Sequence, residues 1–284
     1  MKLQSEEVAN TIDEVRFRHQ NNRVAWNEAA QRYKEDEERV RLLKAGKSSL
    51  HAVERKNLER LGVLSKWCNR AIHLQCASGY DTLSLVLEGV REVIGVDISE
   101  IHINNAEWTT EQLHMPAQWF CCDVLDTPIE LDRTADLVYT GRGAINWIHD
   151  IDAWANVVAR VLREGGVLSL LEDHPASWLF SQESEKLKAS GINYFAHAEA
   201  SQGWTDEYIG NLEKHTVQQA TKYERLWTMA DVFQSLVKAG LAVEYLGEHP
   251  DEYWSAFPKL DDGEKSKIPM TYSLIARKVN RRMG

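Results

Sequence analysis

Residues 71–99 read Ala-Ile-His-Leu-Gln-Cys-Ala-Ser-Gly-Tyr-Asp-Thr-Leu-Ser-Leu-Val-Leu-Glu-Gly-Val-Arg-Glu-Val-Ile-Gly-Val-Asp-Ile-Ser, and this stretch decides the fold. An apolar strand runs into a tight turn of small residues, a helix follows directly, and a second strand ends on Asp97. Small residues let backbone approach a ligand, and the first N–H groups of a helix attract an anionic group. An acid about 20 residues beyond such a turn can accept both hydroxyls of a ribose. The stretch therefore predicts a nucleotide-type cofactor site.

The turn alone does not say which class of cofactor enzyme this is. Gly79 is the only glycine between Gln75 and Asp81, so the Gly-x-Gly-x-x-Gly fingerprint of dinucleotide-binding proteins is missing. Further along, residues 118–122 form an apolar strand that leads to Asp123, and residues 135–140 form another strand. Residues 161–170 then hold a helix end, a double glycine and a fifth strand. Strands that alternate with helices predict a parallel sheet covered on both faces.

In order and spacing, these segments resemble the class I S-adenosylmethionine-dependent methyltransferases over roughly residues 60–175, with residues 271–276 as the last strand. The usual cofactor loop of that family is acid-x-Gly-x-Gly-x-Gly. Here His73 stands at the acid, Gln75 and Ala77 at the first two glycines, and Gly79 at the last. The resemblance implies S-adenosylmethionine as cofactor and S-adenosylhomocysteine as product.

The resemblance also assigns roles to individual cofactor residues. It implies that Asp97 binds the ribose and that Asp123 accepts the adenine amino group, while turn or helix capping is the alternative for each. Because no carboxylate stands at the acid position, Asp81 is a candidate for the contact with the cofactor's amino group, with capping of its own helix as the alternative. The residues expected at the cofactor are Gln75, Cys76, Ala77, Gly79, Asp81, Thr82, Asp97, Ile98, Asp123, Val124, Thr140 and Gly141.

Methyl transfer from a sulfonium depends on in-line positioning of the acceptor, removal of its proton and exclusion of water. His174 is a candidate general base, since histidine titrates near neutral pH, and Asp173 would orient it. The alternative for His174 is a solvated side chain in a turn. Arg142, in the loop after residues 135–140, could hold a carboxylate of the acceptor or of the cofactor, or be a surface arginine.

The predicted fold is α/β: a doubly wound, mostly parallel, seven-stranded Rossmann-like sheet with an N-terminal helical segment and an inserted cap. The predicted parts are 1–62 (helical segment), 63–174 (cofactor-binding core), 175–227 (substrate cap) and 228–284 (C-terminal part of the core sheet). In the first part, helices are expected over residues 28–43 and 50–61, the second capped by Ser49. The expected strands are 71–75, 92–96, 118–122, 137–140, 167–171, 241–246 and 271–276, and the expected core helices are 81–87, 101–113 and 151–162.

The cap is the expected site of acceptor recognition. A connection this long in a compact domain is usually a lid or a small subdomain, and this one is rich in aromatic residues. Aromatic rings offer large contact area with few torsions to freeze. The residues expected to contact the acceptor are Trp147, Trp178, Trp204 and Tyr208, and the alternative is that such rings only pack the cap onto the sheet.

Composition narrows the class of partner. The chain has 284 residues, 43% of them hydrophobic, with a net charge of −10 and four cysteines without zinc-ligand spacing. No run approaches the roughly 18 apolar residues of a membrane span. We therefore expect a cytoplasmic monomer or homodimer that methylates a small molecule, most readily at O or N, without a metal, nucleic acid or membrane partner. The alternatives are a nicotinamide-type oxidoreductase on a similar sheet, or an inactive S-adenosylmethionine-binding regulatory protein, which the departures at His73, Gln75 and Ala77 suggest.

Overall fold

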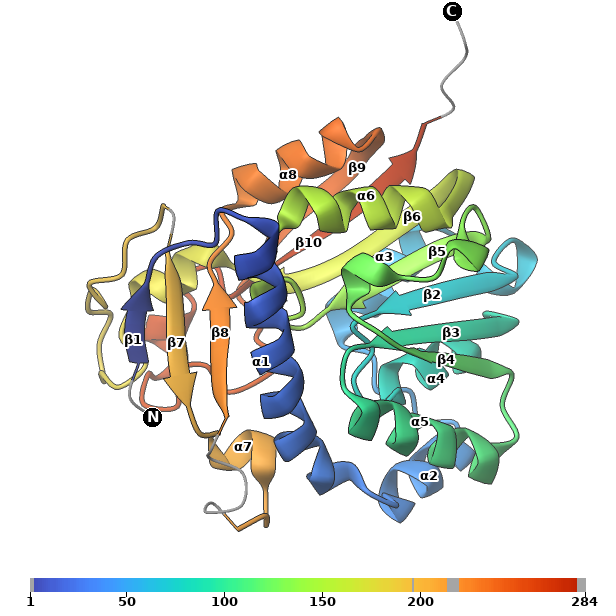
Figure 1. Cartoon of the computed structure of the whole chain (residues 1–284), viewed down its shortest axis with the longest axis horizontal. Helices are drawn as coiled ribbons and strands as arrows, with labels where there is room; N and C mark the ends of the chain where they lie inside the picture. Colours follow the sequence, from blue (N-terminus) through green and yellow to red (C-terminus); the bar gives the residue numbers. More distant parts are fainter. Residues whose placement is uncertain (1–2, 196, 214–219, 280–284) are drawn as a thin grey trace, which may run out of the picture.

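The computed structural model describes residues 3–195, 197–213 and 220–279, and a seven-stranded sheet forms its centre (Figure 1). The strand order is β4-β3-β2-β5-β6-β10-β9. Neighbours from β4 to β6 are parallel, whereas β10 runs antiparallel to both β6 and β9. The strands span β2 Arg70–Leu74, β3 Glu92–Asp97, β4 Ala117–Cys121, β5 Ala135–Gly141, β6 Leu162–Asp173, β9 Leu241–His249 and β10 Thr271–Lys278. The predicted α/β fold is therefore confirmed, and every expected core strand is present.

Alternating side chains bury both faces of the sheet. On β2, Ile72 and Leu74 join the apolar cluster under α6 and α8, whereas Ala71 faces the cluster that contains Leu58 and Leu83. Such two-sided burial is typical of parallel strands, whose crossover helices cover both faces. The helices of this core are α3 Ala52–Arg60, α4 Tyr80–Leu87, α5 Glu100–Leu113, α6 Ile151–Val161 and α8 Met229–Lys238. The helix predictions for residues 81–87, 101–113 and 151–162 each match to within one residue.

The N-terminal segment differs from the prediction in four ways. Residues 3–6 form a strand, β1 Leu3–Glu6, rather than part of a helix. The long helix, α1 Ile12–Ala30, begins at a Thr11–Glu14 capping box, earlier than expected. The turn η1 Gln31–Tyr33 and a left-handed Glu35 then separate it from α2 Glu37–Lys44. Helix α3 is capped by His51, not by Ser49, because the Ser49 hydroxyl is bonded to the Asp81 carboxylate.

The inserted segment builds a second, three-stranded antiparallel sheet with the order β1-β7-β8. Its strands β7 Ala198–Gln202 and β8 Thr221–Arg225 come from the cap, whereas β1 comes from the N-terminus. Helix α1 lies between this small sheet and the main sheet (Figure 1). The Asn22 side chain of α1 bonds both the backbone N–H and the C=O of Tyr223, at 2.7 and 2.9 Å. These bonds satisfy backbone groups of edge strand β8 that a further strand would otherwise pair.

Several short helices and one irregularity of the main sheet also shape the chain. The helices are η6 Pro175–Leu179, α7 Asp206–Ile209 and α9 Asp262–Lys265. The double glycine, expected as a turn before a strand, lies inside β6, where the pairing with β5 shifts register. Gly165 there is left-handed (φ +77°), and a Cβ on Gly166 would lie 2.9 Å from the Ala135 carbonyl oxygen. The strand therefore extends to Leu162 across a kink that only glycine accommodates.

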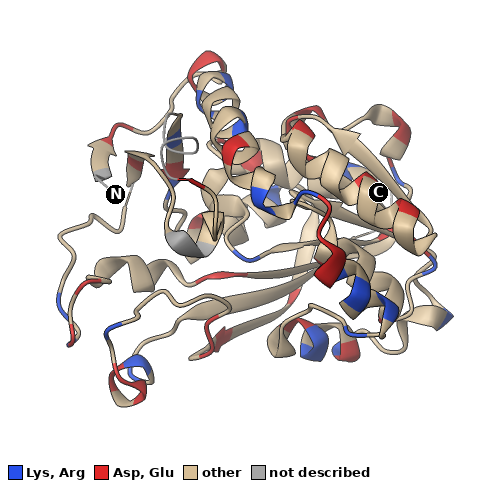
Figure 2. Ribbon diagram, turned by 90° about the horizontal axis from the view of Figure 1, so that it is seen from below, with Lys and Arg blue, Asp and Glu red and all other residues tan. Residues whose placement is uncertain are grey.

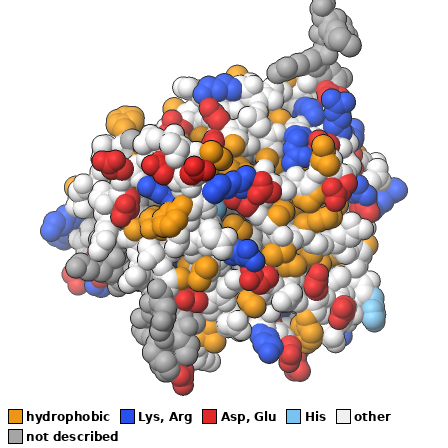
Figure 3. All heavy atoms as spheres, in the orientation of Figure 1, with side chains coloured by type: hydrophobic (Ala, Val, Ile, Leu, Met, Phe, Trp, Pro, Cys, Tyr) orange, Lys and Arg blue, Asp and Glu red, His pale blue; other side chains and the backbone are white. Residues whose placement is uncertain are grey.

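The surface carries charges of both signs. Acidic and basic side chains are interspersed along the outer helices and over the face drawn as spheres, without a continuous basic patch on that face (Figures 2 and 3). None of the helices in the described ranges is both long and apolar enough to cross a membrane. Within residues 3–195, 197–213 and 220–279, no group of three or more His, Cys, Asp and Glu side chains is arranged to hold a metal ion.

Candidate active site

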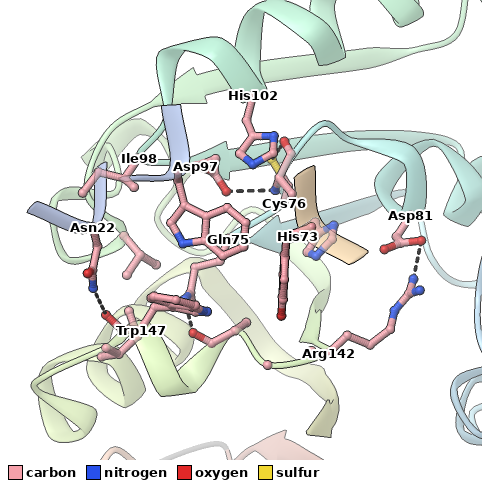
Figure 4. A pocket seen from close by; sticks show the side chains of 18 of the residues that line it. Asn22, His73, Gln75, Cys76, Asp81, Asp97, Ile98, His102, Arg142 and Trp147 are labelled. Carbon is pink, nitrogen blue, oxygen red and sulfur yellow. Dashed lines mark hydrogen bonds and ion pairs between the residues drawn. The ribbon is translucent and has the colours of Figure 1, made fainter. Parts of the chain in front are cut away.

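A cavity of about 360 Å³ lies at the carboxyl ends of the parallel strands, where α/β sheets bind their ligands (Figure 4). The loops after β2, β3, β4 and β5 form its floor, and helix α1 closes it from the side of the small sheet. Of the residues predicted at the site, the cavity is lined by Gln75, Cys76, Ala77, Asp81, Asp97, Ile98, Asp123, Val124, Gly141, Arg142, Trp147 and Tyr208. The fold therefore brings most of the predicted cofactor residues together around this cavity.

The loop after β2 keeps a glycine-type backbone without the glycines. Gln75 and Ala77, at the first two glycine positions of the family loop, have φ angles of +60° and +45°. Left-handed backbone costs a residue with a Cβ roughly 1–2 kcal/mol. Two hydrogen bonds fix the loop: Ala77 N–H donates to Asp97 Oδ2 at 2.8 Å, and Gln75 Nε2 donates to the Ala144 carbonyl at 2.5 Å. The departure from the glycine motif therefore leaves the shape of the loop intact.

This strain gives a stability prediction. Ala77 is exposed, so Ala77→Gly removes little packing and is expected to raise the free energy of unfolding by up to about 1 kcal/mol. The matched control is Ala45→Gly, because Ala45 is also exposed but has a φ of −79°, and this change should destabilise by about 0.5–1 kcal/mol. Urea unfolding of both variants checks the opposite signs, and equal destabilisation by both would contradict the strained loop.

Gly79 serves packing rather than direct lining of the cavity. Its φ is +75°, and a Cβ there would lie 2.3 Å from Cη2 of Trp119. The residue caps α4 and lets this ring lie against the turn. Thr82, likewise expected at the cofactor, is fully buried behind the cavity wall, as is Thr140. None of these three residues lines the cavity, so its geometry does not support their predicted contacts with the cofactor.

Asp97 ends β3 with both carboxylate oxygens directed at backbone. Oδ2 accepts from Ala77 N–H and Oδ1 from Ser99 N–H, at 2.8 and 2.9 Å. Burial raises the pKa of Asp97 to about 6 in spite of these donors. Each carboxylate oxygen has a second lone pair, so the residue can still accept hydrogen bonds from a ligand in the cavity.

Asp123 follows β4 and is held by helix α1. Arg16 Nη1 donates to its Oδ2 at 2.7 Å, and His19 Nδ1 lies 2.8 Å from the same oxygen. His19 Nε2 accepts the backbone N–H of His149 at 3.1 Å, so Nδ1 carries the ring proton and donates to Asp123. Burial acts to raise the pKa of Asp123, but the His19 and Arg16 contacts hold it below its usual range.

His73 replaces the acid of the family loop with an uncharged ring. It is buried, its Nδ1 lies 2.7 Å from Thr82 Oγ1, and its ring meets Tyr139 edge-on at 4.6 Å between centroids. Burial lowers the pKa of His73 to about 3, so the imidazole is neutral at physiological pH. His73 lines the cavity without supplying the negative charge that an acid would bring.

A compact charged cluster lies beside His73. Arg142 forms ion pairs with the Asp81 carboxylate and, at 3.3 Å from Nε, with Glu54 Oε1. Tyr139 Oη donates to Glu54 Oε1 at 2.5 Å. The Glu54 side chain is only 1% exposed, whereas those of Arg142 and Asp81 are 24% and 27% exposed. Asp81 and Arg142 therefore face the cavity and point toward each other (Figure 4), whereas the buried Glu54 and Tyr139 do not line it.

The end of β6 carries two carboxylates, the buried Glu172 and the partly buried Asp173. Glu172 accepts the backbone N–H groups of Gly143, Ala144 and Ile145 at 2.8–3.2 Å and so shapes the loop after β5. Burial and the adjacent Asp173 raise the pKa of Glu172 to about 8, against these three donors. Asp173 Oδ1 accepts from Trp254 Nε1 at 3.1 Å, and burial raises the pKa of Asp173 to about 6. Oδ2 of Asp173 lies 3.7 Å from the position that a Cβ on cavity-lining Gly143 would take.

His174 does not line the cavity, and this argues against its predicted role as general base. Its Nε2 lies 2.9 Å from Glu248 Oε1, and its Nδ1 accepts the backbone N–H of Ala176 at 3.1 Å. Both ring nitrogens are thus engaged, and the residue caps the turn η6. Its neighbour Asp173 instead directs Oδ2 toward cavity-lining Gly143.

The four rings expected at the acceptor separate into two groups. Trp147 and Tyr208 line the cavity. Trp204 is 5% exposed and packs 4.5 Å from the Trp26 ring and 5.3 Å from the Tyr208 ring, centroid to centroid. Trp178 packs edge-on against His197, 6.1 Å away, outside the cavity. Trp204 and Trp178 are therefore packing residues rather than lining residues.

Several lining residues were missed by the sequence analysis. They come from α1, η1, α5, the loop after β5 and the β9–β10 connection: His19, Asn22, Trp26, Tyr33, His102, Gly143, Ala144, Ile148, Tyr253 and Trp254. Residues 19, 22 and 26 are spaced for one helix face, a signal that a helix starting near residue 12 would have revealed. No comparable local pattern marks Tyr253 and Trp254, because their position depends on the fold of a long connection.

Two buried polar atoms at the cavity indicate that it accepts a polar ligand. Gln75 Oε1 and His102 Nε2 find no hydrogen-bond partner within the part of the chain that the structure describes. His102 is 2% exposed, and burial lowers its pKa to about 3, so the ring is neutral. Buried polar atoms without partners are rare, and a ligand's hydroxyl or amino groups would satisfy them. Together with Asp97, these groups fit a nucleoside with a polar side chain.

Comparisons with known proteins show which family model and which solved structures this chain is similar to. Residues 71–166 match the family model described as a methyltransferase domain. An S-adenosylmethionine-dependent methyltransferase from Mesorhizobium loti superposes with a TM-score of 0.56 at 18% identity, covering 80% of this chain and 98% of that one. One from Clostridium acetobutylicum gives 0.56 at 15% identity, covering 84% and 95%. None of the curated proteins matches the chain in sequence.

A third similar structure is that of geranyl diphosphate C-methyltransferase from Streptomyces coelicolor, in complex with Mg²⁺, geranyl diphosphate and S-adenosylhomocysteine. It superposes with a TM-score of 0.55 at 11% identity, covering 80% of this chain and 79% of that one. These chains share the fold of the main sheet. Residues 71–166 thus match a methyltransferase domain, and the chain has the fold of S-adenosylmethionine-dependent methyltransferases. The domain match favours a methyltransferase over the alternative of a nicotinamide-type oxidoreductase.

Proposed function

We propose that this protein transfers the methyl group of S-adenosylmethionine to an oxygen or nitrogen atom of a small-molecule acceptor. The observation that carries the proposal is one continuous cavity, which joins the cofactor loops to a region walled by Trp147, Tyr208, Tyr253 and Trp254. Aromatic walls with a few polar groups suit a flat or partly apolar small molecule. The net charge of −10 and the mixed surface charge argue against a nucleic-acid acceptor.

The chain's residues would hold the cofactor through the carboxyl ends of β3 and β4. Asp97 is placed to accept the ribose hydroxyls, and Asp123, fixed by Arg16 and His19, to accept the adenine amino group. When bound, the cofactor supplies an already activated methyl group, so the protein's task is positioning and exclusion of water. Helix α1 and the small sheet provide that exclusion on one side of the cavity.

Asp173 is our candidate for the group that takes the acceptor's proton. It is partly exposed, its Oδ2 lies beside cavity-lining Gly143, and Trp254 fixes the orientation of its carboxylate. A pKa of about 6 leaves it ionised at neutral pH yet able to accept a proton, which suits a general base. Glu172 acts as a positioning residue, since it holds the three N–H groups of the loop that lines the cavity.

The general-base assignment predicts a pH profile. Asp173 must be unprotonated to act, and its pKa is raised to about 6, so kcat/KM for the acceptor, measured at saturating S-adenosylmethionine, should be constant above pH 7 and fall about tenfold per unit below pH 6. Asp173→Asn should remove this acidic limb. His174→Ala serves as the matched control, because both His174 nitrogens are engaged elsewhere, and it should keep the limb. A limb that disappears in His174→Ala but persists in Asp173→Asn would reverse the assignment.

Two measurements test the proposed function itself. Calorimetry should show binding of S-adenosylhomocysteine, and methyl-donor turnover over a panel of small hydroxyl- and amino-bearing metabolites should show methylated product by mass spectrometry. Binding without turnover of any panel member would support the inactive, cofactor-binding alternative, whereas no binding would overturn the proposal altogether.

A further inference from the structure

The amino-acid end of the cofactor needs recognition that the family loop normally assists with an acid. In this chain the acid position is His73, whose ring is neutral and whose Nδ1 is taken by Thr82. A buried, neutral imidazole cannot balance the positive charge of an α-ammonium group. Another group at this end of the cavity must therefore supply the charge.

Asp81 and Arg142 are the charged residues at that end. Both line the cavity, and they come from different elements: Asp81 from the first turn of α4 and Arg142 from the loop after β5. Arg142 adopts a left-handed backbone (φ +59°), which is unfavourable for a residue with a Cβ. The loop thus holds a strained conformation at the residue that directs its guanidinium toward Asp81 (Figure 4).

The surroundings keep this pair charged. Burial acts to raise the pKa of Asp81, but Arg142 and the Ser49 hydroxyl hold it below its usual range. Glu54, sealed behind the pair, holds Arg142 through Nε and is itself held by Tyr139 Oη and by the backbone N–H of His51. Glu54, Tyr139 and Ser49 therefore act as positioning residues for one anion and one cation that both face the cavity.

We propose that Asp81 and Arg142 together bind the amino-acid end of S-adenosylmethionine, Asp81 through its α-ammonium group and Arg142 through its α-carboxylate. The inference rests on the proposed function, since it concerns the cofactor of that reaction. A paired anion and cation at one end of a cavity complement a zwitterion, and a guanidinium suits a planar carboxylate. Because His73 is neutral, Asp81 is the residue that supplies the negative charge beside the loop after β2.

The alternative is that the pair only ties the loop after β5 to α4. The two roles differ in which part of a ligand they affect. S-adenosylhomocysteine and 5′-methylthioadenosine share the nucleoside and the thioether sulfur, but the second lacks the amino-acid group. Loss of a structural tie would lower the affinity for both ligands alike. Loss of a contact with the zwitterionic amino-acid group would lower only the affinity for S-adenosylhomocysteine.

The experiment is calorimetry of both ligands with the full-length protein. Asp81→Asn and Arg142→Lys should each lower the affinity for S-adenosylhomocysteine by roughly tenfold or more, as expected for loss of a hydrogen bond between charged groups. The affinity for 5′-methylthioadenosine should change by less than about twofold. The matched control is Asp132→Asn, which breaks a similarly half-exposed pair with Arg160 remote from the cavity and should leave both affinities unchanged.

Each outcome distinguishes between the two roles of the pair. An equal loss for both ligands in Asp81→Asn and Arg142→Lys would overturn the inference and assign the pair a structural role. Unchanged affinity for S-adenosylhomocysteine in both folded variants would overturn it as well. Failure of the wild-type protein to bind either ligand would instead contradict the proposed function. Melting curves identify a variant that does not fold, in which case the other variant carries the test.

Discussion

Replacement of Asp97 by alanine is expected to lower the affinity for S-adenosylhomocysteine at least a hundredfold. In the proposed complex the carboxylate accepts two ribose hydroxyls, and each hydrogen bond to a charged group contributes about 1.5–3 kcal/mol. No other carboxylate ends β3, and the nearby backbone N–H groups of Ala77 and Ser99 cannot accept hydrogen bonds. Calorimetry measures the affinity directly.

The control separates binding from folding. Asp97 also accepts hydrogen bonds from two backbone N–H groups, so its removal leaves these N–H groups without that partner and can destabilise the fold. Asp97→Asn keeps one oxygen acceptor and nearly the same volume, so it should melt closer to the wild-type temperature while still binding the nucleoside poorly. Unchanged affinity in a folded Asp97→Asn protein would remove this residue from the ribose contact.

The parts of the fold that the sequence predicted are those with local signals. The parallel strands are runs of apolar residues that end on Asp97 or Asp123, and the crossover helices carry caps such as Ser99 and Asp150. In contrast, β1 is four residues long and polar, and it is a strand only because β7, nearly 200 residues later, pairs with it. Such non-local pairing leaves no periodicity in the segment itself.

The site shows the same division between local and non-local information. Asp97, Asp123 and the residues of the β2 turn were predictable because strand ends meet at one edge of a parallel sheet. The prediction that His174 faces the cavity was wrong because neighbouring side chains at a strand end point in different directions. Asp173 turns toward Gly143 at the cavity, whereas His174 turns toward Glu248. The wall formed by α1, with His19 and Trp26, depends on a helix that spans from the first sheet to the second.

Trp204→Ala is expected to destabilise the protein by about 3–5 kcal/mol, the range typical of deleting a buried tryptophan ring. The ring is 5% exposed and joins α1 to the small sheet, since it packs against Trp26 on one side and lies 4.9 Å from Lys222 Nζ. Urea unfolding measures the loss. Trp178→Ala is the control, because Trp178 is only half-buried and outside this cluster, and it should cost less.

Tyr208→Ala should give the contrasting result. Tyr208 is partly exposed and lines the cavity, so its removal should raise the KM for the acceptor or lower kcat more than it lowers the melting temperature. Cofactor affinity should stay near the wild-type value, because the cofactor loops lie after β2, β3 and β4. If Trp204→Ala kept full stability and altered only acceptor kinetics, the packing role of Trp204 would be wrong. If Tyr208→Ala lost stability with normal acceptor kinetics, the cavity wall formed by the cap would be structural, and acceptor recognition would rest on Trp147 and the rings of the β9–β10 connection.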